Sequence, residues 1–431
     1  MCRPGLRFPF HLPFYDSRFT WQNGRQMIKQ RRVVVTGLGA VTSIGSNVPE
    51  FWAGLLAGRC GIGPVSLFDA SPYRTQTAAE VRDIPDAFLT PAQKRRMSRA
   101  DRMGLAAAAE AVEQSGLDLS RENPSRIGVV LGGGTSGLLD SEDFFFRHLH
   151  GQAARPSRVL NHMPDAITDR VAQHFGVEGI KSTITTACSS SANAMGYAHD
   201  AIAAGWADVV LTGGSDVLAR LTYGGFNSLR SVDPGPCRPF DRERKGLSIG
   251  EAAGILVFEE RERARRRGAL IFAEFLGYGV TSDAFHMTAP DPSGSAGGRT
   301  IQAALACSGL DAADVDYVNA HGTATPQNDS AETAAIKTAL GSRAREIPVS
   351  SIKSMIGHCL CASGAIEGVA TVLTLRDQLV PPTIHYENAD PACDLDYVPN
   401  ASREAEIDVA ISNSFAFGGN SSVVVFANAN R

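Results

Sequence analysis

The chain has 431 residues, of which 43% are hydrophobic and 20% are charged. This length allows two or three average domains or one large domain with a duplicated core, and the composition is that of an ordinary globular protein. The formal net charge of −4 gives no reason to expect nucleic acid or an anionic membrane as a partner, and no apolar run is long enough to span a membrane.

The cysteines favour a reducing compartment. The sequence contains eight of them, scattered along the chain and without a CxxC pair. This pattern argues against a secreted disulfide framework and against a structural zinc site. We therefore expect a cytoplasmic setting.

The first 28 residues are rich in Phe, Pro and Arg and show no regular period. They lack the apolar stretch and the small-residue cleavage site of a signal peptide. We expect residues 1–28 to be a disordered extension, or an upstream start with Met27 as the natural first residue. A transit peptide is the less favoured alternative.

From Arg31 onward, short β-prone runs alternate with helical segments. The pattern predicts helices at 48–57, 90–114 and 189–204, and the charged run 259–267 is expected to be a solvated helix face. The predicted strands are 33–35, ending in a Thr-Gly-Leu-Gly turn, and then 127–131, 182–186, 209–212 and 254–258.

The pattern restarts after about residue 270. The predicted helices are 298–308, 330–339 and 363–375, and the predicted strands are 271–280, 317–320, 347–350, 409–412 and 422–427. Strands that alternate with helices favour largely parallel, buried sheets. We therefore predict two similar α/β halves, residues 29–270 and residues 271–431.

Cys188 stands where a predicted strand ends and a predicted helix begins, among small residues. Helix N-termini carry unpaired N–H groups and a partial positive charge, which favour a thiolate. A buried, inert thiol is the commoner fate of a cysteine, and we keep that interpretation for Cys60, Cys307 and Cys393. The position of Cys188 favours a nucleophile instead.

Two histidines stand next to glycine near the ends of predicted strands. His321 lies in the stretch NAHGTAT, and His358 lies in SSIKSMIGH, five residues after Lys353. A cysteine with a histidine could indicate a protease. Two histidines with one cysteine suggest a thioester-forming nucleophile and paired donors for an enolate oxygen.

The stretch NSFAFGGN, residues 413–420, lies between two predicted strands. Its two glycines allow unusual backbone angles and can expose N–H groups. It is either a simple hairpin-like turn or an oxyanion-hole donor beside a movable aromatic ring.

Taken in order, these motifs resemble the β-ketoacyl-acyl carrier protein synthases of the type I/II group, closest to synthase II, in the thiolase superfamily. The resemblance runs from about Arg31 to Ala427 and implies an α/β thiolase fold, a duplicated five-layer αβαβα core with a Cys-His-His site at the join. The matching stretches are VVVTGLGAVTSIG, TTACSSSANA, RPFDRERKGLSIGEAAG, SDAFHMTAPDP, NAHGTATPQND, SIKSMIGHCLCASGAIEG, PPTIHYENADPACDLDYVP and SNSFAFGGN.

The resemblance also implies a catalytic set. Cys188 would take the acyl chain from a carrier thioester. His321 and His358 would assist decarboxylation of a malonyl unit and bind the enolate. The backbone N–H groups of Cys188 and Phe417 would hold the oxyanion, and the Phe417 ring would act as a gate.

Further residues would support this set. Lys353 would tune His358 and the local field, and Glu367 would pair with it. The remaining roles implied are acidic support by Asp329 and Glu332, binding of the pantetheine arm by Thr323 and Thr325, and carrier docking by the basic run Lys94, Arg95, Arg96 and Arg99. That run could equally be a solvated helix face. No metal or organic cofactor is implied, because the phosphopantetheine belongs to the carrier.

The main prediction is a decarboxylative Claisen condensation of an acyl chain on Cys188 with malonyl-acyl carrier protein, giving a 3-oxoacyl product in fatty acid biosynthesis. The sequence departs from the usual pattern at Ala416, where most elongating synthases have Gly, and at Asn420-Ser421, where Thr-Asn is usual. The alternative is therefore a ketosynthase subunit of a type II polyketide or aryl-polyene pathway.

A non-catalytic chain-length factor is less favoured, because such a protein would lack Cys188. A degradative thiolase would need a second catalytic cysteine in the C-terminal motif, and residues 410–427 contain none. The expected partners are acyl carrier protein, malonyl and acyl thioesters, and a second subunit, either a second copy or a chain-length factor. The length and saturation of the acyl chain are left open.

Overall fold

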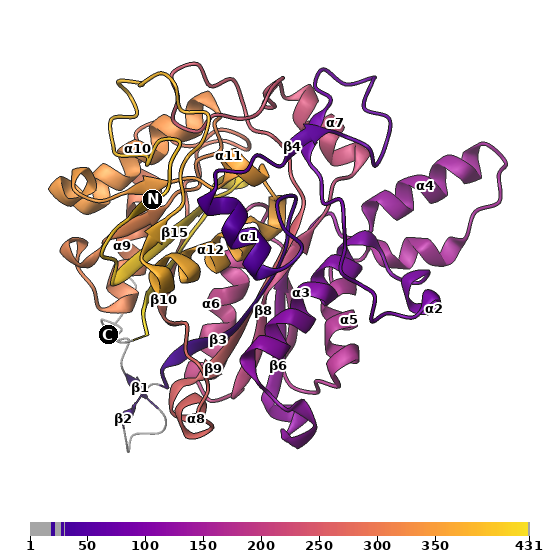
Figure 1. Cartoon of the computed structure of the whole chain (residues 1–431), viewed down its shortest axis with the longest axis horizontal. Helices are drawn as coiled ribbons and strands as arrows, with labels where there is room; N and C mark the ends of the chain where they lie inside the picture. Colours follow the sequence, from indigo (N-terminus) through magenta and orange to yellow (C-terminus); the bar gives the residue numbers. More distant parts are fainter. Residues whose placement is uncertain (1–18, 22–26, 30, 430–431) are drawn as a thin grey trace, which may run out of the picture.

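A computed structural model describes residues 19–21, 27–29 and 31–429 (Figure 1). Strands β1 (Phe19–Trp21) and β2 (Met27–Lys29) pair in antiparallel fashion. The remainder of the extension predicted at residues 1–28 lies outside the described residues. No helix in the described ranges is both long and apolar enough to cross a membrane.

The centre of the molecule is a ten-stranded sheet in the order β12-β11-β15-β16-β10-β3-β9-β8-β6-β7. The N-terminal half supplies β3 (Val33–Val41), β6 (Ile127–Gly132), β7 (Lys181–Ile184), β8 (Val209–Asp216) and β9 (Ala252–Glu260). The C-terminal half supplies β10 (Ala273–Ser282), β11 (Tyr317–Asn319), β12 (Val349–Ser350), β15 (Val409–Phe415) and β16 (Asn420–Asn428). Two further antiparallel pairs lie outside it: β4 (Ile62–Pro64) with β5 (Thr77–Ala79), and β13 (Leu379–Val380) with β14 (Arg403–Glu404).

Both halves repeat one topology. Numbered in chain order within its own half, each set of five strands lies in the order 3-2-4-5-1, with the fifth strand antiparallel to both neighbours and the other pairings parallel. The first strands, β3 and β10, pair with each other in antiparallel fashion and join the halves. The predicted duplication of the core is therefore confirmed.

The strand directions differ from the prediction. The five pairings in the middle of the sheet, from β15–β16 across to β9–β8, are all antiparallel. The prediction of largely parallel sheets was therefore wrong for the centre and holds only toward the two edges. A short apolar run does not indicate whether a strand pairs in parallel or antiparallel fashion. When both faces of the sheet are buried, as here, both kinds of strand have the same apolar composition.

Helices form three layers around the two halves of the sheet (Figure 1). On the outer face of the N-terminal half lie α3 (Arg99–Ser115) and α5 (Ala166–Phe175), and on that of the C-terminal half lies α9 (Ser295–Ser308), with α10 (Pro326–Leu340) packed on it. Between the halves, α6 (Ser190–Ala203) and α12 (Ser363–Asp377) contact strands of both. This is the predicted five-layer αβαβα arrangement of the thiolase fold.

The other helical segments are shorter or lie outside these layers. The α-helices are α1 (Val48–Leu56), α2 (Pro91–Lys94), α4 (Leu138–Leu149), α7 (Arg220–Ser228), α8 (Arg261–Arg266) and α11 (Lys353–Ile356). The short 3-10 turns are Leu119–Arg121, Pro124–Arg126, Pro156–His162, Ala312–Asp314, Gly341–Arg345, Leu360–Ala362 and Phe417–Gly419.

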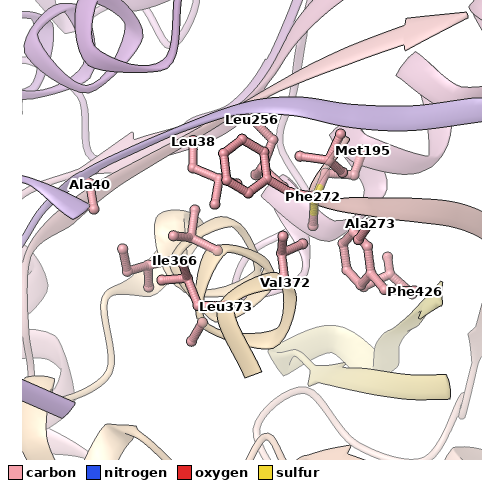
Figure 2. Packing of buried hydrophobic residues seen from close by; sticks show 14 of the residues in the cluster. Leu38, Ala40, Met195, Leu256, Phe272, Ala273, Ile366, Val372, Leu373 and Phe426 are labelled. Carbon is pink, nitrogen blue, oxygen red and sulfur yellow. The ribbon is translucent and has the colours of Figure 1, made fainter. Parts of the chain in front are cut away.

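The central core surrounds α12, in which every residue from Ser363 to Leu375 is buried. Figure 2 shows Ile366 and Leu373 of this helix near Leu38 of β3, with Phe426 of β16 in the same cluster. A helix that is buried on every face is enclosed by the rest of the protein on all sides. Because α12 is held in this way, its polar side chains near residues 363–367 have fixed positions.

The predicted turn at residues 36–39 is wrong, because β3 continues through it to Val41. Its glycines serve close packing rather than a turn. A Cβ on Gly37 would lie 2.1 Å from the carbonyl oxygen of Ala111, and one on Gly39 would lie 1.8 Å from that of Ala107. Both carbonyls belong to α3, which therefore packs on β3 at a separation that only glycine allows.

The charged run 259–267 is not a simple solvated face. Glu259 belongs to β9 and is fully buried, and its carboxylate pairs with Arg263 and, at 2.7 Å, with Arg267. One arginine of α8 and the residue that caps its C-terminus thus reach back to a buried carboxylate. A buried charge needs partners of this kind, so part of the run is structural.

Candidate active site

Cys188 lies between the end of β7 and the start of α6, as the sequence predicts. The backbone turns sharply there, since Ala187 has a φ of 52°, and the Ser190 N–H donates to the Ala187 carbonyl at 3.1 Å. The side chain is 7% exposed. The loop therefore presents a thiol that is nearly enclosed but touches a cavity.

The thiol is protonated at rest. Burial raises the pKa of Cys188 to about 11, and this effect outweighs the opposing influence of the Lys353 charge and of a hydrogen bond from the Phe417 backbone. The expectation that the start of α6 favours a thiolate is thus wrong for the resting protein. Desolvation therefore outweighs the Lys353 charge and the backbone hydrogen bonds that favour the thiolate.

His321 follows β11 and is anchored through its backbone. The N–H groups of His321 and Gly322 donate to the two carboxylate oxygens of Glu332, each at 2.7 Å. Nδ1 of the His321 ring lies 3.4 Å from Nζ of Lys353. Since an ammonium group can only donate, Nδ1 is the acceptor and the ring proton is on Nε2.

Lys353 is buried at the start of α11 and forms an ion pair with Glu367 of α12. Burial raises the pKa of Glu367, and the ammonium group opposes that rise. Lys353 contacts His321 rather than His358, although its charge lowers the pKa of both rings. Lys353, paired with Glu367, thus acts on the histidines through its contact with His321 and through its charge.

His358 follows α11, and its backbone N–H donates to the Ser248 carbonyl at 2.7 Å. Nδ1 of its ring lies 2.8 Å from the hydroxyl oxygen of Ser363. The rings of His321 and His358 are 5.2 Å apart and nearly perpendicular, at 88°. Burial is the main reason why the pKa of each ring lies well below its ordinary value, so both are neutral.

Ser363 was missed at the sequence level. It stands five residues after His358, but the chain between them turns through Leu360, whose φ is 52°. The spacing alone therefore does not indicate a contact between the two side chains.

Acidic support lies behind His321. Asp329 accepts hydrogen bonds from the backbone N–H groups of Phe240, at 2.6 Å, and Ala324, at 3.1 Å. Burial raises the pKa of Asp329 to about 6, with Arg244 opposing. With Glu332, this carboxylate fixes the loop that carries His321 and Thr323.

A cavity of about 340 Å³ connects these groups with the surface. Cys188, His321 and His358 line its inner part, and Leu229, Arg230 and His286, which are exposed, line its outer part. Thr323 and Thr325 also line it, with their hydroxyl oxygens 3.0 Å apart. One cavity thus joins the thiol, both histidines and the two threonines.

The loop after β15 closes one side of the cavity. The ring of Phe417 lies 5.7 Å from that of Phe226, measured between centroids. Gly418 and Gly419 have φ values of 75° and 72°, and a Cβ on Gly419 would lie 2.0 Å from a carboxylate oxygen of Asp283. The segment is therefore a tight, glycine-dependent turn that joins the antiparallel strands β15 and β16 as a hairpin.

The basic run divides into two kinds of residue. Arg95 and Arg96 are exposed, and the described part of the chain gives neither an ionic partner. Lys94 pairs with Asp86 at 2.6 Å, and Arg99 pairs with the fully buried Glu251 at 2.5 Å. The inclusion of Arg99 in a docking patch is therefore wrong, because its guanidinium is committed to a buried carboxylate.

A cavity that combines one thiol, two neutral imidazoles and a glycine-rich loop, set between two copies of one α/β topology, defines a condensing enzyme of the thiolase-like class. Residues 30–264 match the model of the β-ketoacyl synthase N-terminal domain, and residues 272–387 match that of the C-terminal domain. The chain belongs to the β-ketoacyl synthase family and is a condensing acyltransferase.

Similar proteins span nearly the whole chain. The 3-oxoacyl-[acyl-carrier-protein] synthase 2 of Synechocystis is 42% identical, and that of Staphylococcus aureus strain COL is 40% identical; each alignment covers 93% of this chain and 98% or 99% of the relative. Among solved structures, the ishigamide ketosynthase/chain length factor superposes with a TM-score of 0.88 at 35% identity, covering 93% of this chain and 99% of that one.

Proposed function

We propose that this chain joins an acyl group, held as a thioester on Cys188, to the two-carbon unit of malonyl-acyl carrier protein, giving a 3-oxoacyl-carrier product in fatty acid synthesis. One observation carries the proposal: a single cavity holds the Cys188 thiol together with the neutral rings of His321 and His358. Relatives that are named 3-oxoacyl-[acyl-carrier-protein] synthase 2 support the pathway.

The first step is acyl transfer. Sγ of Cys188 attacks the thioester carbonyl, a new C–S bond forms, and the carrier thiol leaves with the proton. The backbone N–H groups of Cys188 and Phe417, which face the sulfur region, would hold the oxyanion. A donor preorganised in this way contributes roughly 3–4 kcal/mol to lowering the barrier.

The second step is decarboxylation. The C–C bond to the malonyl carboxylate breaks, carbon dioxide leaves, and the electron pair moves onto the thioester oxygen. His321 and His358 would each donate an Nε2–H hydrogen bond to that oxygen, a role that suits two neutral, fixed rings. The enolate carbon then attacks the acyl carbonyl, the C–S bond to Cys188 breaks, and the departing thiolate takes up a proton from water that reaches the cavity from the surface.

The carrier would deliver its substrate through the outer part of the cavity. Thr323 and Thr325, which line the cavity, would hydrogen-bond the pantetheine arm, and the exposed Arg95 and Arg96 would attract an acidic carrier surface. The chain's own chemistry then needs no metal and no further cofactor, because the arm comes with the carrier. One solved relative at 33% identity is described as a type II polyketide ketosynthase complex with its acyl-carrier protein.

A second subunit completes the expected assembly. Strand β7 forms the edge of the ten-stranded sheet just before Cys188, so a partner that adds a strand there would lie near the site. Two solved relatives are described with a chain length factor. Here the partner would be a second copy or such a factor. The protein would be cytoplasmic, and its two halves would meet between residues 270 and 271.

A polyketide or aryl-polyene pathway is the second candidate. A Streptomyces halstedii protein named "Putative polyketide beta-ketoacyl synthase 1" is 44% identical over 417 residues. A chain of the Xenorhabdus doucetiae complex of the ketosynthase ApeO with its chain length factor ApeC superposes with a TM-score of 0.82 at 30% identity, covering 93% of this chain and 98% of that chain. Ala416 and Asn420 flank the Phe417 loop and are the positions through which this chain would differ in acyl preference.

The experiment is a condensation assay with mass-tagged acyl carriers and malonyl-acyl carrier protein. We expect acylation of Cys188, release of carbon dioxide and a 3-oxoacyl product, with none of the product formed by Cys188→Ser. A protein that neither becomes acylated nor releases carbon dioxide would contradict the proposal and favour a chain-length-factor role. Saturated and polyunsaturated acyl chains, compared in one panel, separate the two pathways.

A further inference from the structure

The start of α12 contacts His358 directly and is linked to His321 through Lys353. Ser363 and Glu367 are four residues apart and therefore lie on the same side of this helix. Glu367 pairs with Lys353, which contacts Nδ1 of His321. The hydroxyl of Ser363 contacts Nδ1 of His358 directly, at 2.8 Å.

The available hydrogen-bond partners of Ser363 decide which group donates in its contact with His358. Ser363 is 1% exposed, and within residues 31–429 the His358 ring is the one partner that the structure gives its hydroxyl. If Nδ1 carried the ring proton, the hydroxyl would accept it and its own proton would be buried without an acceptor, which is costly. The hydroxyl therefore donates, and Nδ1 accepts.

The tautomer of His358 follows. A neutral imidazole carries one ring proton, so an accepting Nδ1 places that proton on Nε2. This is the nitrogen that must donate to the enolate oxygen during decarboxylation. With the other tautomer, Nε2 would present a lone pair to the developing negative charge and would repel it.

We propose that Ser363 is a positioning residue that holds His358 in the Nε2–H tautomer, as Lys353, which pairs with Glu367 of the same helix, does for His321. The inference rests on the proposed function, because it assigns a purpose to the tautomer in malonyl decarboxylation. Ser363 does not touch the reacting atoms and acts through His358.

Three variants of the full chain test this. Ser363→Ala removes the hydroxyl, Ser363→Thr keeps it, and Thr371→Val removes another buried hydroxyl of α12, which bonds the Glu367 carbonyl and neither histidine. Losing one hydrogen bond that selects a tautomer should slow malonyl-acyl carrier protein decarboxylation about five- to tenfold in Ser363→Ala. Ser363→Thr should recover most of the rate, Thr371→Val should match the wild type, and transfer of an acyl group to Cys188 should be unchanged in all three.

Nitrogen NMR of ring-labelled histidine gives a readout that a merely structural role would not move. The His358 signal, assigned by its loss in His358→Asn, should show an Nε2–H tautomer in the wild type and in Ser363→Thr, and a mixture in Ser363→Ala. His321 should keep its tautomer throughout, since Lys353 is untouched. A pure Nε2–H signal with a wild-type decarboxylation rate in Ser363→Ala would overturn the inference. A wild-type protein without any acylation or decarboxylation would instead contradict the proposed function, while the spectrum would still report on the contact.

Discussion

Nζ of Lys353 lies 3.4 Å from Nδ1 of His321 and pairs with the carboxylate of Glu367, all three groups being buried. The lysine thus links a carboxylate that never meets substrate to a ring that does. Removing it has two separable consequences, one for folding and one for chemistry.

Lys353→Met should lower the free energy of unfolding by about 3–5 kcal/mol, because it leaves the Glu367 carboxylate buried without its counter-charge. The double variant Lys353→Met/Glu367→Leu should regain most of that loss in urea unfolding. It should still decarboxylate malonyl-acyl carrier protein at least about tenfold more slowly, because nothing then fixes the His321 proton. A stable double variant with the wild-type rate would contradict the role of Lys353.

The thiol of Cys188 should react slowly at neutral pH. Its pKa is raised to about 11, so the thiol is protonated below that pH and the reactive thiolate becomes available only as the pH rises toward 11. The rate of alkylation by iodoacetamide should therefore rise about tenfold per pH unit between roughly pH 7 and 10. Mass spectrometry of the Cys188 peptide, in a Cys60→Ala background that removes an exposed thiol, measures this rate. A rate that is already constant near neutral pH would show a stabilised thiolate instead.

Gly419→Ala should distort the loop that carries Phe417. The residue has a φ of 72°, and the added Cβ would meet the carboxylate of Asp283. The strain should cost about 1–3 kcal/mol and displace the Phe417 N–H, so acylation of Cys188 should slow markedly. Ala416→Gly is the matched control, because Ala416 has ordinary extended angles of −102° and 158° and makes no demand for glycine. Equal acylation rates in Gly419→Ala and the wild type would mean that the loop does not support the oxyanion.

The two kinds of arginine in the basic run should respond differently. Arg95→Glu/Arg96→Glu should raise KM for the acyl carrier severalfold, more at low salt, while leaving turnover of a small coenzyme A thioester unchanged. Arg99→Gln should instead lower stability by about 3–5 kcal/mol, because Glu251 would lose its partner. If the double glutamate variant bound carrier normally, the docking surface would have to lie elsewhere.

The sequence predicts where the helices and strands lie better than it predicts whether neighbouring strands run parallel or antiparallel. The alternation of strands and helices and the restart near residue 270 indicate the duplicated core. The antiparallel centre is not visible in short apolar runs, and Gly37 and Gly39 suggest a turn until the close approach of α3 explains them.

Cys188, His321 and His358 were found from their neighbours in sequence, and the cavity brings all three together. The residues that contact the catalytic side chains from α12 could not be predicted in this way, because their positions depend on how the helix packs. Because α12 is enclosed on all sides, it brings Ser363 to His358 and Glu367 to Lys353. The raised pKa of Cys188 likewise follows from its burial, and the residues next to it in sequence do not indicate that burial.

The repeated topology assigns Cys188 and His358 to matching places. Each follows the third strand of its half, β7 or β12, and precedes the central helix, α6 or α12. Two identical subunits could not divide the work in this way, since each would carry the same residue at that place. Linking the two copies in one polypeptide lets the N-terminal half carry the acyl acceptor and the C-terminal half carry a hydrogen-bond donor. The reaction therefore depends on two halves that share one topology but differ in the residue at this place.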